Sequence, residues 1–438
     1  MKSIDRIPIT KIQRASKLVG TGTKVGINYL KYYGDKLINT EEVAKERLDK
    51  KNAEDIYDSL KQLKGSALKV AQMLSMEKSF LPKAYVEQFS LSQFSVPPLS
   101  APLVKKTFIN QFGKSPFELF DTFNEHAMNA ASIGQVHYAE KDGHKYAVKI
   151  QYPGVADSIS SDLALVKPIA LRMFNIPSKD SDKYFKEVEE KLLEETNYIQ
   201  ELEQSQFISN ACKHIPNLRF PNYHKSLSNS RILTMDYMEG VHLASYCKTN
   251  TDEKLNKMLG QALWDFFMFQ IHHLKMVHAD PHPGNFLVSN SGKLIVLDFG
   301  CIKKIPLDFY IPYFELAQPE VLNNEDKFEN KLFELEILME SDSEEEKLFF
   351  KKMFKDLLKV FTKPFHNETF DFSDQSFFNE VINLGELYAK NSEIRKYNSN
   401  RGSKHFIYIN RMFFGLYNLM FDLKAKDVTI NNYVTLID

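Results

Sequence analysis

The stretch from 277 to 300 constrains this chain more than any other. Asp280 is followed five residues later by Asn285, and Asp298 stands eighteen residues after Asp280, directly behind the apolar run 294–297. In phosphoryl transfer from a nucleotide, one Asp orients or deprotonates the acceptor, while an Asn and a second Asp hold the metal ions that bridge the phosphates. The combined spacing therefore favours kinase-like chemistry over a loop with incidental Asp and His residues.

Length and charge narrow the class of protein. A chain of 438 residues is expected to form two or three packed units. Its net charge of −1, with 26% charged residues, is typical of an ordinary globular protein and argues against bulk nucleic-acid binding. Three cysteines, Cys212, Cys247 and Cys301, are odd in number and far apart, which predicts a cytoplasmic location and no disulfide framework.

The first 36 residues carry eight basic and two acidic side chains. Apolar residues lie between them, which predicts peripheral contact of this basic N-terminus with an anionic membrane surface. The alternative is a solvated or loosely packed arm, because Gly20, Gly22 and Gly26 oppose a continuous helix. The sequence contains neither a secretory signal nor a run of 18 uninterrupted apolar residues, so a membrane-spanning helix is not expected.

Residues 41–76 have a helical pattern. Spacings of four and three predict one apolar stripe along the helix. The stripe consists of Ile56, Leu60, Leu63, Ala67, Val70 and Leu74. Lys69 and Gln72 share a different face, and composition alone makes them solvated surface groups. Prolines after residue 81 end this region, so a domain boundary near residue 100 is expected.

The segments 129–139 and 146–150 are rich in β-forming residues and flank the turn 141–144. This arrangement predicts a β-hairpin. Small residues before the first strand allow the backbone to approach a phosphate, and Lys149 follows in an Ala-Val-Lys context from which its charge reaches phosphates. The order of loop, lysine and downstream Asp/Asn/Asp set is the order that a kinase fold requires.

A lysine of this kind needs a carboxylate on a following helix. Residues 187–206 have a helical pattern, with apolar positions at Val188, Leu192, Leu193, Ile199 and Leu202. Periodicity does not choose among the candidate partners Glu194, Glu195, Glu201 and Glu203. The segment 231–240 then runs from an apolar strand into a polar turn, as a hinge between two lobes would, and the pattern beyond it is helical almost to the end.

Four motifs in this order resemble those of the UbiB/ADCK/AarF family of atypical protein-kinase-like proteins. The family's Lys-x-Gly-Gln signature appears at 69–72, with Ala in place of its Gly. Its alanine-rich nucleotide loop is matched by 130–137, its lysine strand by 147–154 and its catalytic loop by 278–285. The resemblance covers at least 61–304.

The resemblance implies an α+β, two-lobed protein-kinase-like fold, with a small β-rich N-lobe and a helical C-lobe. The expected domains are an N-terminal helical extension over 1–105, the N-lobe over 106–240 and the C-lobe over 241–438.

The resemblance also implies ATP and Mg²⁺ as ligands and assigns roles to single residues. Asp280 is the expected catalytic carboxylate, and Glu201, in the family's Glu-Ala-x-Asn segment, is the expected partner of Lys149. Asn285 and Asp298 are expected to hold Mg²⁺. The residues implied in nucleotide binding are Lys149 and, in the loop and hinge, Ala130, Ala131, Ser132, Ile133, Gly134, Gln135, Val136, Met235, Tyr237 and Met238.

In the family, the Lys-x-Gly-Gln segment folds over the active site as a lid and pairs with a Glu-x-Asp motif, which occludes the place of a peptide substrate. Lys69, Gln72 and Glu195 match these motifs, so the resemblance reverses the surface interpretation of Lys69 and Gln72. Asn197 stands where the family has Asp. After Gly300 there is no Ala-Pro-Glu motif and only a short connection, so an activation segment able to dock a peptide is not expected.

Three functions follow as expectations. The first is an ATPase or a small-molecule or lipid kinase that supports isoprenoid-quinone (ubiquinone or menaquinone) metabolism, with an isoprenoid lipid or quinone precursor as partner. The second is a nucleotide-dependent binding module with little turnover. The third is a protein Ser/Thr kinase, which the occluding segment disfavours. Zinc held by His278 and His282 is a further alternative, opposed by Pro281 and Pro283, which prevent a regular helix.

Overall fold

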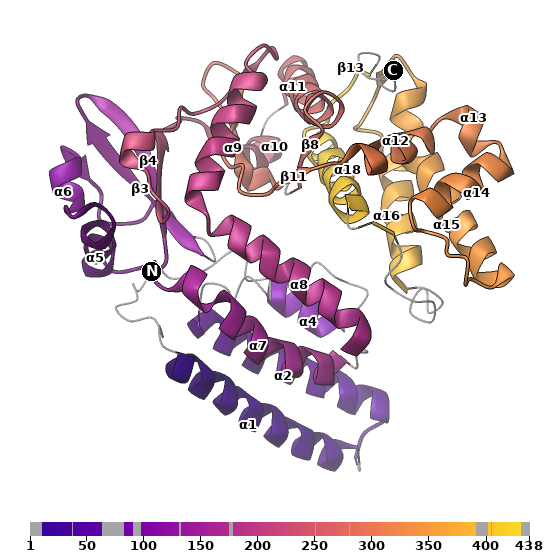
Figure 1. Cartoon of the computed structure of the whole chain (residues 1–438), viewed down its shortest axis with the longest axis horizontal. Coiled ribbons are helices and arrows are strands. Elements are labelled where there is room, and N and C mark those ends of the chain that lie inside the picture. Colours follow the sequence, from indigo (N-terminus) through magenta and orange to yellow (C-terminus); the bar gives the residue numbers. More distant parts are fainter. Residues whose placement is uncertain are drawn as a thin grey trace. The chain divides into compact units, whose positions relative to one another are not determined.

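The computed structural model describes residues 11–36, 38–63, 83–90, 98–130, 133–174, 178–249, 251–279, 281–390, 402–403 and 405–430. The chain divides into two compact units, the first made of 1–202 with 222–237 and the second of 203–221 with 238–438. Their mixture of helices and small sheets agrees with the expected α+β class (Figure 1). The domain boundaries near 105 and 240 stay predictions.

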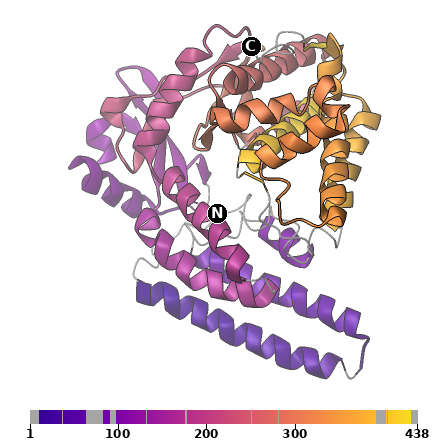
Figure 2. The same ribbon diagram turned by 45° about the vertical axis from the view of Figure 1, so that its right-hand side comes forward.

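The helices at the start of the first unit are α1 (Lys11–Asp35), α2 (Glu41–Leu63) and α4 (Lys83–Ser90). Helices α1 and α2 lie side by side in two views of the molecule (Figure 2). The apolar stripe predicted for α2 is confirmed over its described part, because Ile56 and Leu60 are buried. Its predicted continuation to residue 76, with Lys69 and Gln72, lies outside the described residues.

The expectation that Gly20, Gly22 and Gly26 interrupt the N-terminal helix is wrong, because α1 runs through all three. Packing against α2 compensates for the weak helix propensity of glycine. Across this contact the buried hydroxyl of Thr21 donates to Ser59 Oγ at 2.6 Å. The three glycines lie on the other side, where a Cβ built on each would meet nothing within 4 Å.

The sheet of the first unit contains β1 (Thr122–Phe123), β2 (Asn129–Ala130), β3 (Gly134–Lys141), β4 (His144–Gln151) and β6 (Ile232–Asp236). The strands are antiparallel in the order β1-β3-β4-β6, and β2 also pairs with β3. The predicted hairpin is confirmed as β3 and β4. Between them, Asp142 and Gly143 have φ angles of 51° and 76°, and positive φ at both positions is what a two-residue type I′ turn requires.

The remaining elements of the first unit are α5 (Ala101–Phe112), α6 (Pro116–Leu119), α7 (Val155–Phe174), α8 (Ser178–Glu195), α9 (Tyr198–Ala211) and the 3₁₀ turn η2 (Lys225–Leu227). Helix α9 starts in the first unit and continues into the second from Glu203. The prediction of a single helix over 187–206 is wrong, because α8 ends at Glu195 and a separate helix, α9, starts at Tyr198. Asn197 causes a new helix start there: its side-chain oxygen accepts from the backbone N–H of Gln200 at 3.2 Å, as an N-cap does. Of the predicted apolar positions, Leu193 and Ile199 are 48% and 37% exposed.

The second unit contains a four-stranded sheet, a two-stranded sheet and a buried central helix. In order across the larger sheet, the strands are β5 (Leu218–Arg219), β10 (Leu294–Val296), β9 (Phe286–Val288) and β7 (Val241–His242). The smaller sheet pairs β8 (Met276–His278) with β11 (Ile302–Lys304). Helices α10 (Leu243–Thr249) and α11 (Glu253–His272) follow β7. The aromatic side chains of Trp264, Phe266 and Phe267 make α11 the centre of the core, since all three are fully buried.

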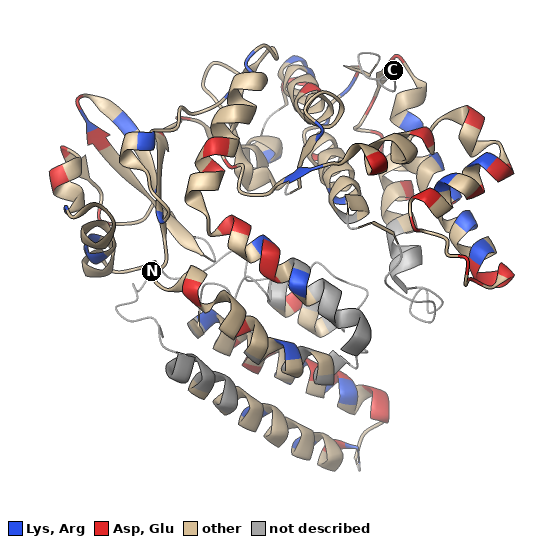
Figure 3. Ribbon diagram, in the orientation of Figure 1, with Lys and Arg blue, Asp and Glu red and all other residues tan. Residues whose placement is uncertain are grey.

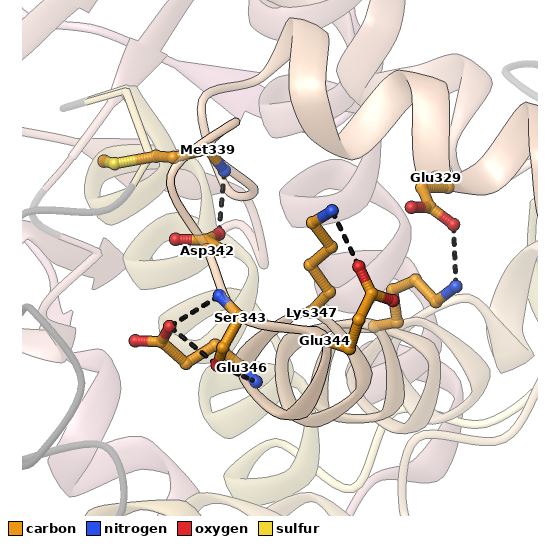
Figure 4. A network of polar contacts seen from close by, with 8 residues as sticks. Glu329, Met339, Asp342, Ser343, Glu344, Glu346 and Lys347 are labelled. Atoms are coloured by element: carbon orange, nitrogen blue, oxygen red, sulfur yellow. Dashed lines mark hydrogen bonds and ion pairs between the residues drawn. The ribbon is translucent and has the colours of Figure 1, made fainter.

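The chain after β11 is mainly helical, with α12 (Leu307–Glu315), α13 (Pro319–Leu322), α14 (Glu325–Glu334), α15 (Glu344–Phe361), η4 (Lys363–His366), α16 (Gln375–Lys390) and α18 (His405–Asp422), and β12 (Thr369–Phe370) pairs with β13 (Val428–Thr429). A capping box starts α15 (Figure 4). Ser343 Oγ accepts from the N–H of Glu346 at 3.3 Å, and the Glu346 carboxylate accepts from the N–H of Ser343 at 2.9 Å. Among the described residues, no helix is both long and apolar enough to span a bilayer.

Candidate functional site

The first unit contains an ion pair between Lys149 on β4 and Glu201 on α9. Lys149 Nζ lies 2.7 Å from Glu201 Oε1, and the two side chains are only 18% and 4% exposed. Tyr198, at the start of α9, places its buried ring 5.1 Å from the same ammonium group. A pair so withdrawn from water depends on both partners, because removing one leaves an uncompensated buried charge.

The expected nucleotide loop spans the end of β2 and the start of β3. Ala131 and Ser132 lie outside the described residues, and Ile133 is buried. Gly134 has no room for a side chain, since a Cβ there would come within 2.7 Å of the Ile150 carbonyl oxygen and 2.9 Å of the Tyr198 hydroxyl. At Gly134 the backbone is therefore held directly against the lysine strand.

Gln135 and His137 on β3 face the interior. Gln135 Oε1 accepts from the N–H of Leu99 at 2.6 Å, and its Nε2 lies 2.7 Å from His137 Nε2. Burial lowers the pKa of His137, which favours a neutral imidazole. Because the Gln135 side chain is committed to these contacts, its expected contact with a nucleotide would have to come from its backbone.

The expected hinge follows β6. Met235 is buried in that strand, and the ring of Tyr237 packs edge-on against Tyr138 with centroids 5.1 Å apart. Between them, Asp236 accepts from His224 Nε2 at 2.7 Å if that nitrogen is protonated. Burial raises the pKa of Asp236, but hydrogen bonds from His224 and Asn222 outweigh this effect and lower it overall. Met238 begins the longer of the two segments that form the second unit.

In the second unit, pairing of β8 with β11 fixes the start of the expected catalytic loop. His278 lies opposite Ile302, and the N–H of Ala279 donates to the Cys301 carbonyl at 2.8 Å. The buried His278 ring places Nε2 2.7 Å from the backbone carbonyl oxygen of Asp298. Asp280 itself lies outside the described residues.

The hairpin of β9 and β10 brings the two expected magnesium ligands to neighbouring positions. Leu297 donates its N–H to the carbonyl of Asn285 at 3.0 Å, so Asp298 is one residue beyond the position opposite Asn285. Asp298 Oδ1 accepts from the N–H of Gly300 at 2.7 Å. Phe299 is fully buried, and its ring packs against Phe266 of α11.

The side-chain types at the start of β9 and the end of β10 fit a hard cation. Carboxylate and amide oxygens are the donors that Mg²⁺ prefers, and Asn285 and Asp298 supply one of each. His278 and His282 fit zinc less well, since His278 Nε2 contacts the Asp298 carbonyl and His282 Nδ1 accepts from the N–H of Gly284 at 3.1 Å. Over the described ranges, no group of three or more His, Cys, Asp or Glu side chains is arranged to hold a metal.

The connection after Asp298-Phe299-Gly300 is short. Only 301–306, which include β11, separate Gly300 from α12. The connection is as short as the sequence predicts, and the lack of an activation segment able to dock a peptide stays a prediction.

The expected lid residues are only partly described. Glu195 ends α8, while Lys69 and Gln72 lie outside the described residues. Asn197, which replaces the family's Asp, caps α9 with its side-chain oxygen, and an Asp would supply the same acceptor. At this position the departure from the family motif therefore preserves the local helix start.

Two residues at this site were missed by sequence reasoning. Gln151 hydrogen-bonds to Thr196 beside the Lys149–Glu201 pair, and the ring of Tyr198 lies against the Lys149 ammonium group. Neither side chain is charged, whereas the Asp, Lys and Glu residues were selected by their charge. Their signals were spacing alone: Gln151 follows Lys149 by two on one face of a strand, and Tyr198 precedes Glu201 by three on one face of a helix.

A β-sheet unit with a paired lysine, followed by a mainly helical unit with this loop and hairpin, has the two parts of a protein-kinase-like fold. The sequence model of the ABC1 atypical kinase-like domain matches residues 91–332, more than half of the chain. The chain belongs to this family, and the resemblance to UbiB/ADCK/AarF proteins is confirmed.

Relatives and a solved structure agree with this assignment. The chain is 30% identical to Arabidopsis thaliana protein ACTIVITY OF BC1 COMPLEX KINASE 8, chloroplastic, over 57% of this chain and 34% of that protein. It is 28% identical to the Saccharomyces cerevisiae atypical kinase COQ8, mitochondrial, over 75% of this chain and 66% of that protein. The structure of the Rv3197–erythromycin complex from Mycobacterium tuberculosis matches with a TM-score of 0.60 and 25% identity, covering 91% of this chain and 98% of the other. The chain spans about half the length, or less, of several curated relatives.

Proposed function

We propose that this protein binds Mg·ATP and transfers or hydrolyses its γ-phosphoryl group as an atypical kinase or ATPase. The observation that carries the proposal is the 2.7 Å contact between Lys149 and Glu201, because a buried lysine held by a helix glutamate is the phosphate-binding arrangement of kinases. Asn285 and Asp298 support it from the second unit, where the β9–β10 hairpin brings them close in register.

Each residue has a separate task in this mechanism. Lys149 neutralises the α- and β-phosphates, and the backbone of the small-residue loop before β3 approaches them. Asp280 orients the attacking hydroxyl or water and accepts its proton. Asn285 and Asp298 would hold Mg²⁺, which would supply charge neutralisation at the phosphates.

The acceptor we favour is an isoprenoid lipid or quinone precursor, so that the activity supports ubiquinone or menaquinone metabolism. The family membership and the yeast relative COQ8 support this choice. The short segment 301–306 disfavours a protein Ser/Thr kinase, since it leaves little chain for docking a peptide. The competing function is a nucleotide-dependent binding module that closes on a lipid or partner with little turnover.

We assign Lys69 and Gln72, together with Glu195, to a lid over the nucleotide. The support is the motif match, and Asn197 preserves the start of α9 beside Glu195. Replacing Lys69 with Ala should change the ratio of ADP to ATP affinity or the hydrolysis rate. Unchanged values for both would return Lys69 to a solvated surface.

We place the protein in the cytoplasm, in peripheral contact with an anionic membrane through α1. Ile27, Leu30 and Tyr33 are spaced three residues apart along α1, and their side chains are 47%, 73% and 65% exposed. Lys24 and Lys31 on the same helix are also exposed. Figure 3 shows few charged residues on the described part of α1, whereas α2 carries many of both signs. This pattern suits an interfacial helix.

Vesicle flotation tests this contact. Leu30→Asp should reduce flotation on anionic vesicles at low salt, whereas Leu348→Asp, at a leucine 67% exposed on α15, should not. Equal flotation of both variants and the wild type, or flotation of none, would remove α1 from membrane binding.

An ATPase assay tests the proposed function. Phosphate release by the full chain should exceed that of Lys149→Met, and it should rise when an isoprenoid-quinone precursor or detergent is added. Nucleotide binding without turnover under all conditions would favour the binding module. If the full chain neither binds ATP nor hydrolyses it, the proposal is contradicted.

A further inference from the structure

Gln151, at the end of β4, reaches across to the junction of α8 and α9. Its side chain is 1% exposed, and its Nε2 donates to the backbone carbonyl of Thr196 at 2.9 Å. Thr196 is itself buried, and its hydroxyl donates back to the Leu192 carbonyl at 3.0 Å. A single side chain thus ties the strand that carries Lys149 to the residue that precedes the N-cap of α9.

Arg231 fixes the orientation of this amide. Arg231 Nη1 donates to Gln151 Oε1 at 2.6 Å, so the NH₂ group must point toward Thr196. The backbone N–H of Gln151 also donates to the Arg231 carbonyl at 2.9 Å, and Arg231 Nη2 lies 3.5 Å from Asp157 Oδ1. These contacts hold Gln151 from both its backbone and its side chain.

The junction determines where Glu201 lies. The N–H of Glu201 donates to the Asn197 carbonyl at 3.0 Å, inside the first turn of α9. Thr196 directly precedes the N-cap Asn197, and Glu201 lies in the first turn that this cap starts, so a displacement of Thr196 is passed to that turn through the cap. Tyr198, between them, already packs against the ammonium group of Lys149.

We propose that Gln151, oriented by Arg231, is a positioning residue that holds Glu201 against Lys149. This inference rests on the proposed function, since it names the regulation of the same site. In ordinary kinases the corresponding pair is controlled by movement of a helix and by the activation loop. Here the hydrogen bonds of Gln151 to Thr196 and Arg231, which we call the clamp, hold the pair with residues of the first unit alone. This suits a chain in which only the short segment 301–306 follows Gly300 before α12.

Titration calorimetry of the full chain with Mg·ATP tests the clamp. Gln151→Met keeps the volume but removes both hydrogen bonds, and it should weaken Mg·ATP binding by about ten-fold. Gln151→Glu keeps an acceptor for Arg231 but loses the donor to Thr196, so it should be as weak as the Met variant. If the two Gln151 variants fold poorly, Arg231→Met replaces them, since the Arg231 side chain is 28% exposed. It should weaken Mg·ATP binding in the same direction, but less.

Thr234→Val is the matched control. It removes a buried hydrogen bond, from the Thr234 hydroxyl to the Leu227 carbonyl at 2.6 Å, on the neighbouring strand β6 and away from the junction. It should lower the melting temperature and leave Mg·ATP affinity unchanged. A similar affinity loss in this variant would mean that any weakening of the sheet suffices, which would overturn the clamp.

A double-mutant cycle shows whether Gln151 acts through the ion pair. In a Glu201→Gln background, Gln151→Met should change the affinity by less than about two-fold, because the pair it supports is already lost. Full additivity of the two losses would contradict the inference.

Hydrogen exchange separates this inference from the proposed function. Amides of 197–203 should exchange faster in Gln151→Met than in the wild type without any nucleotide, whereas Thr234→Val should not change them. This readout holds even if the wild type fails to bind Mg·ATP. Unchanged exchange over 197–203 would show that Gln151 does not hold the junction.

Discussion

Lys149 Nζ and Glu201 Oε1 lie 2.7 Å apart, although 52 residues separate the two along the chain. The strand partners of Lys149 are Val136 and Leu233, so it sits in the middle of the sheet and not at an edge. Its ammonium group is therefore fixed by backbone pairing on two sides and by the Glu201 carboxylate at its tip.

Replacing this carboxylate should weaken nucleotide binding. We expect Glu201→Gln to lower Mg·ATP affinity by about ten-fold or more, because a neutral amide no longer balances the buried lysine. Glu203→Gln, an exposed glutamate two residues further along α9, is the control and should bind as the wild type does. Titration calorimetry on both variants decides the matter, and equal affinities would show that Glu201 does not support Lys149.

Local patterns in the sequence predicted the hairpin of β3 and β4 because its turn chemistry is written in two adjacent residues, Asp142 and Gly143. They failed at the glycines of α1, where packing against α2 outweighs propensity, and at Asn197, whose cap divides one predicted helix into two. Glu201 could not be chosen from four glutamates by periodicity, because its partner is distant in the chain. Only the resemblance named it, and the roles of the site residues stay predictions.

The N-cap at Asn197 gives a prediction about the departure from the family motif. Asn197→Asp should leave the melting temperature nearly unchanged, since either side chain accepts the N–H of Gln200. Asn197→Ala should cost about 1 kcal/mol of unfolding free energy, because that N–H loses its partner. Urea unfolding of the three proteins measures this difference, and a loss in the Asp variant as large as in the Ala variant would contradict the capping role.

Gly415 on α18 leaves room for the loop that carries Asp280. A Cβ at Gly415 would lie 2.1 Å from Cγ of Pro281, which is buried and rigid. Gly415→Ala should therefore destabilise the protein by about 1–3 kcal/mol and lower ATP hydrolysis, since the loop must shift. Gly26→Ala, with nothing within 4 Å, should instead stabilise by up to about 1 kcal/mol. Equal effects on melting temperature from both changes would contradict this packing.

His272 predicts how stability depends on pH. Burial, with further contributions from the charges of Lys275 and His273, lowers the pKa of His272 to about 3. The unfolded chain binds this proton below its ordinary pKa near 6.5, so the unfolding free energy falls as the pH drops from about 6.5 toward 3, by at most about 1.4 kcal/mol per pH unit. His272→Phe, beside the ring of Phe314, should flatten this part of the curve. Parallel curves for the two proteins between pH 7 and pH 4 would show that His272 does not contribute.

The proposed function depends most directly on metal-assisted ATP binding at Asp298, and a thermal-shift titration with Mg·ATP measures it. The wild type should gain melting temperature with increasing Mg·ATP, and Asp326→Asn, at an exposed carboxylate on α14, should gain as much. Asp298→Asn should melt close to the wild type without nucleotide, because an amide oxygen still accepts the N–H of Gly300, but it should gain nothing from Mg·ATP. Equal stabilisation of Asp298→Asn and the wild type by Mg·ATP would contradict the account.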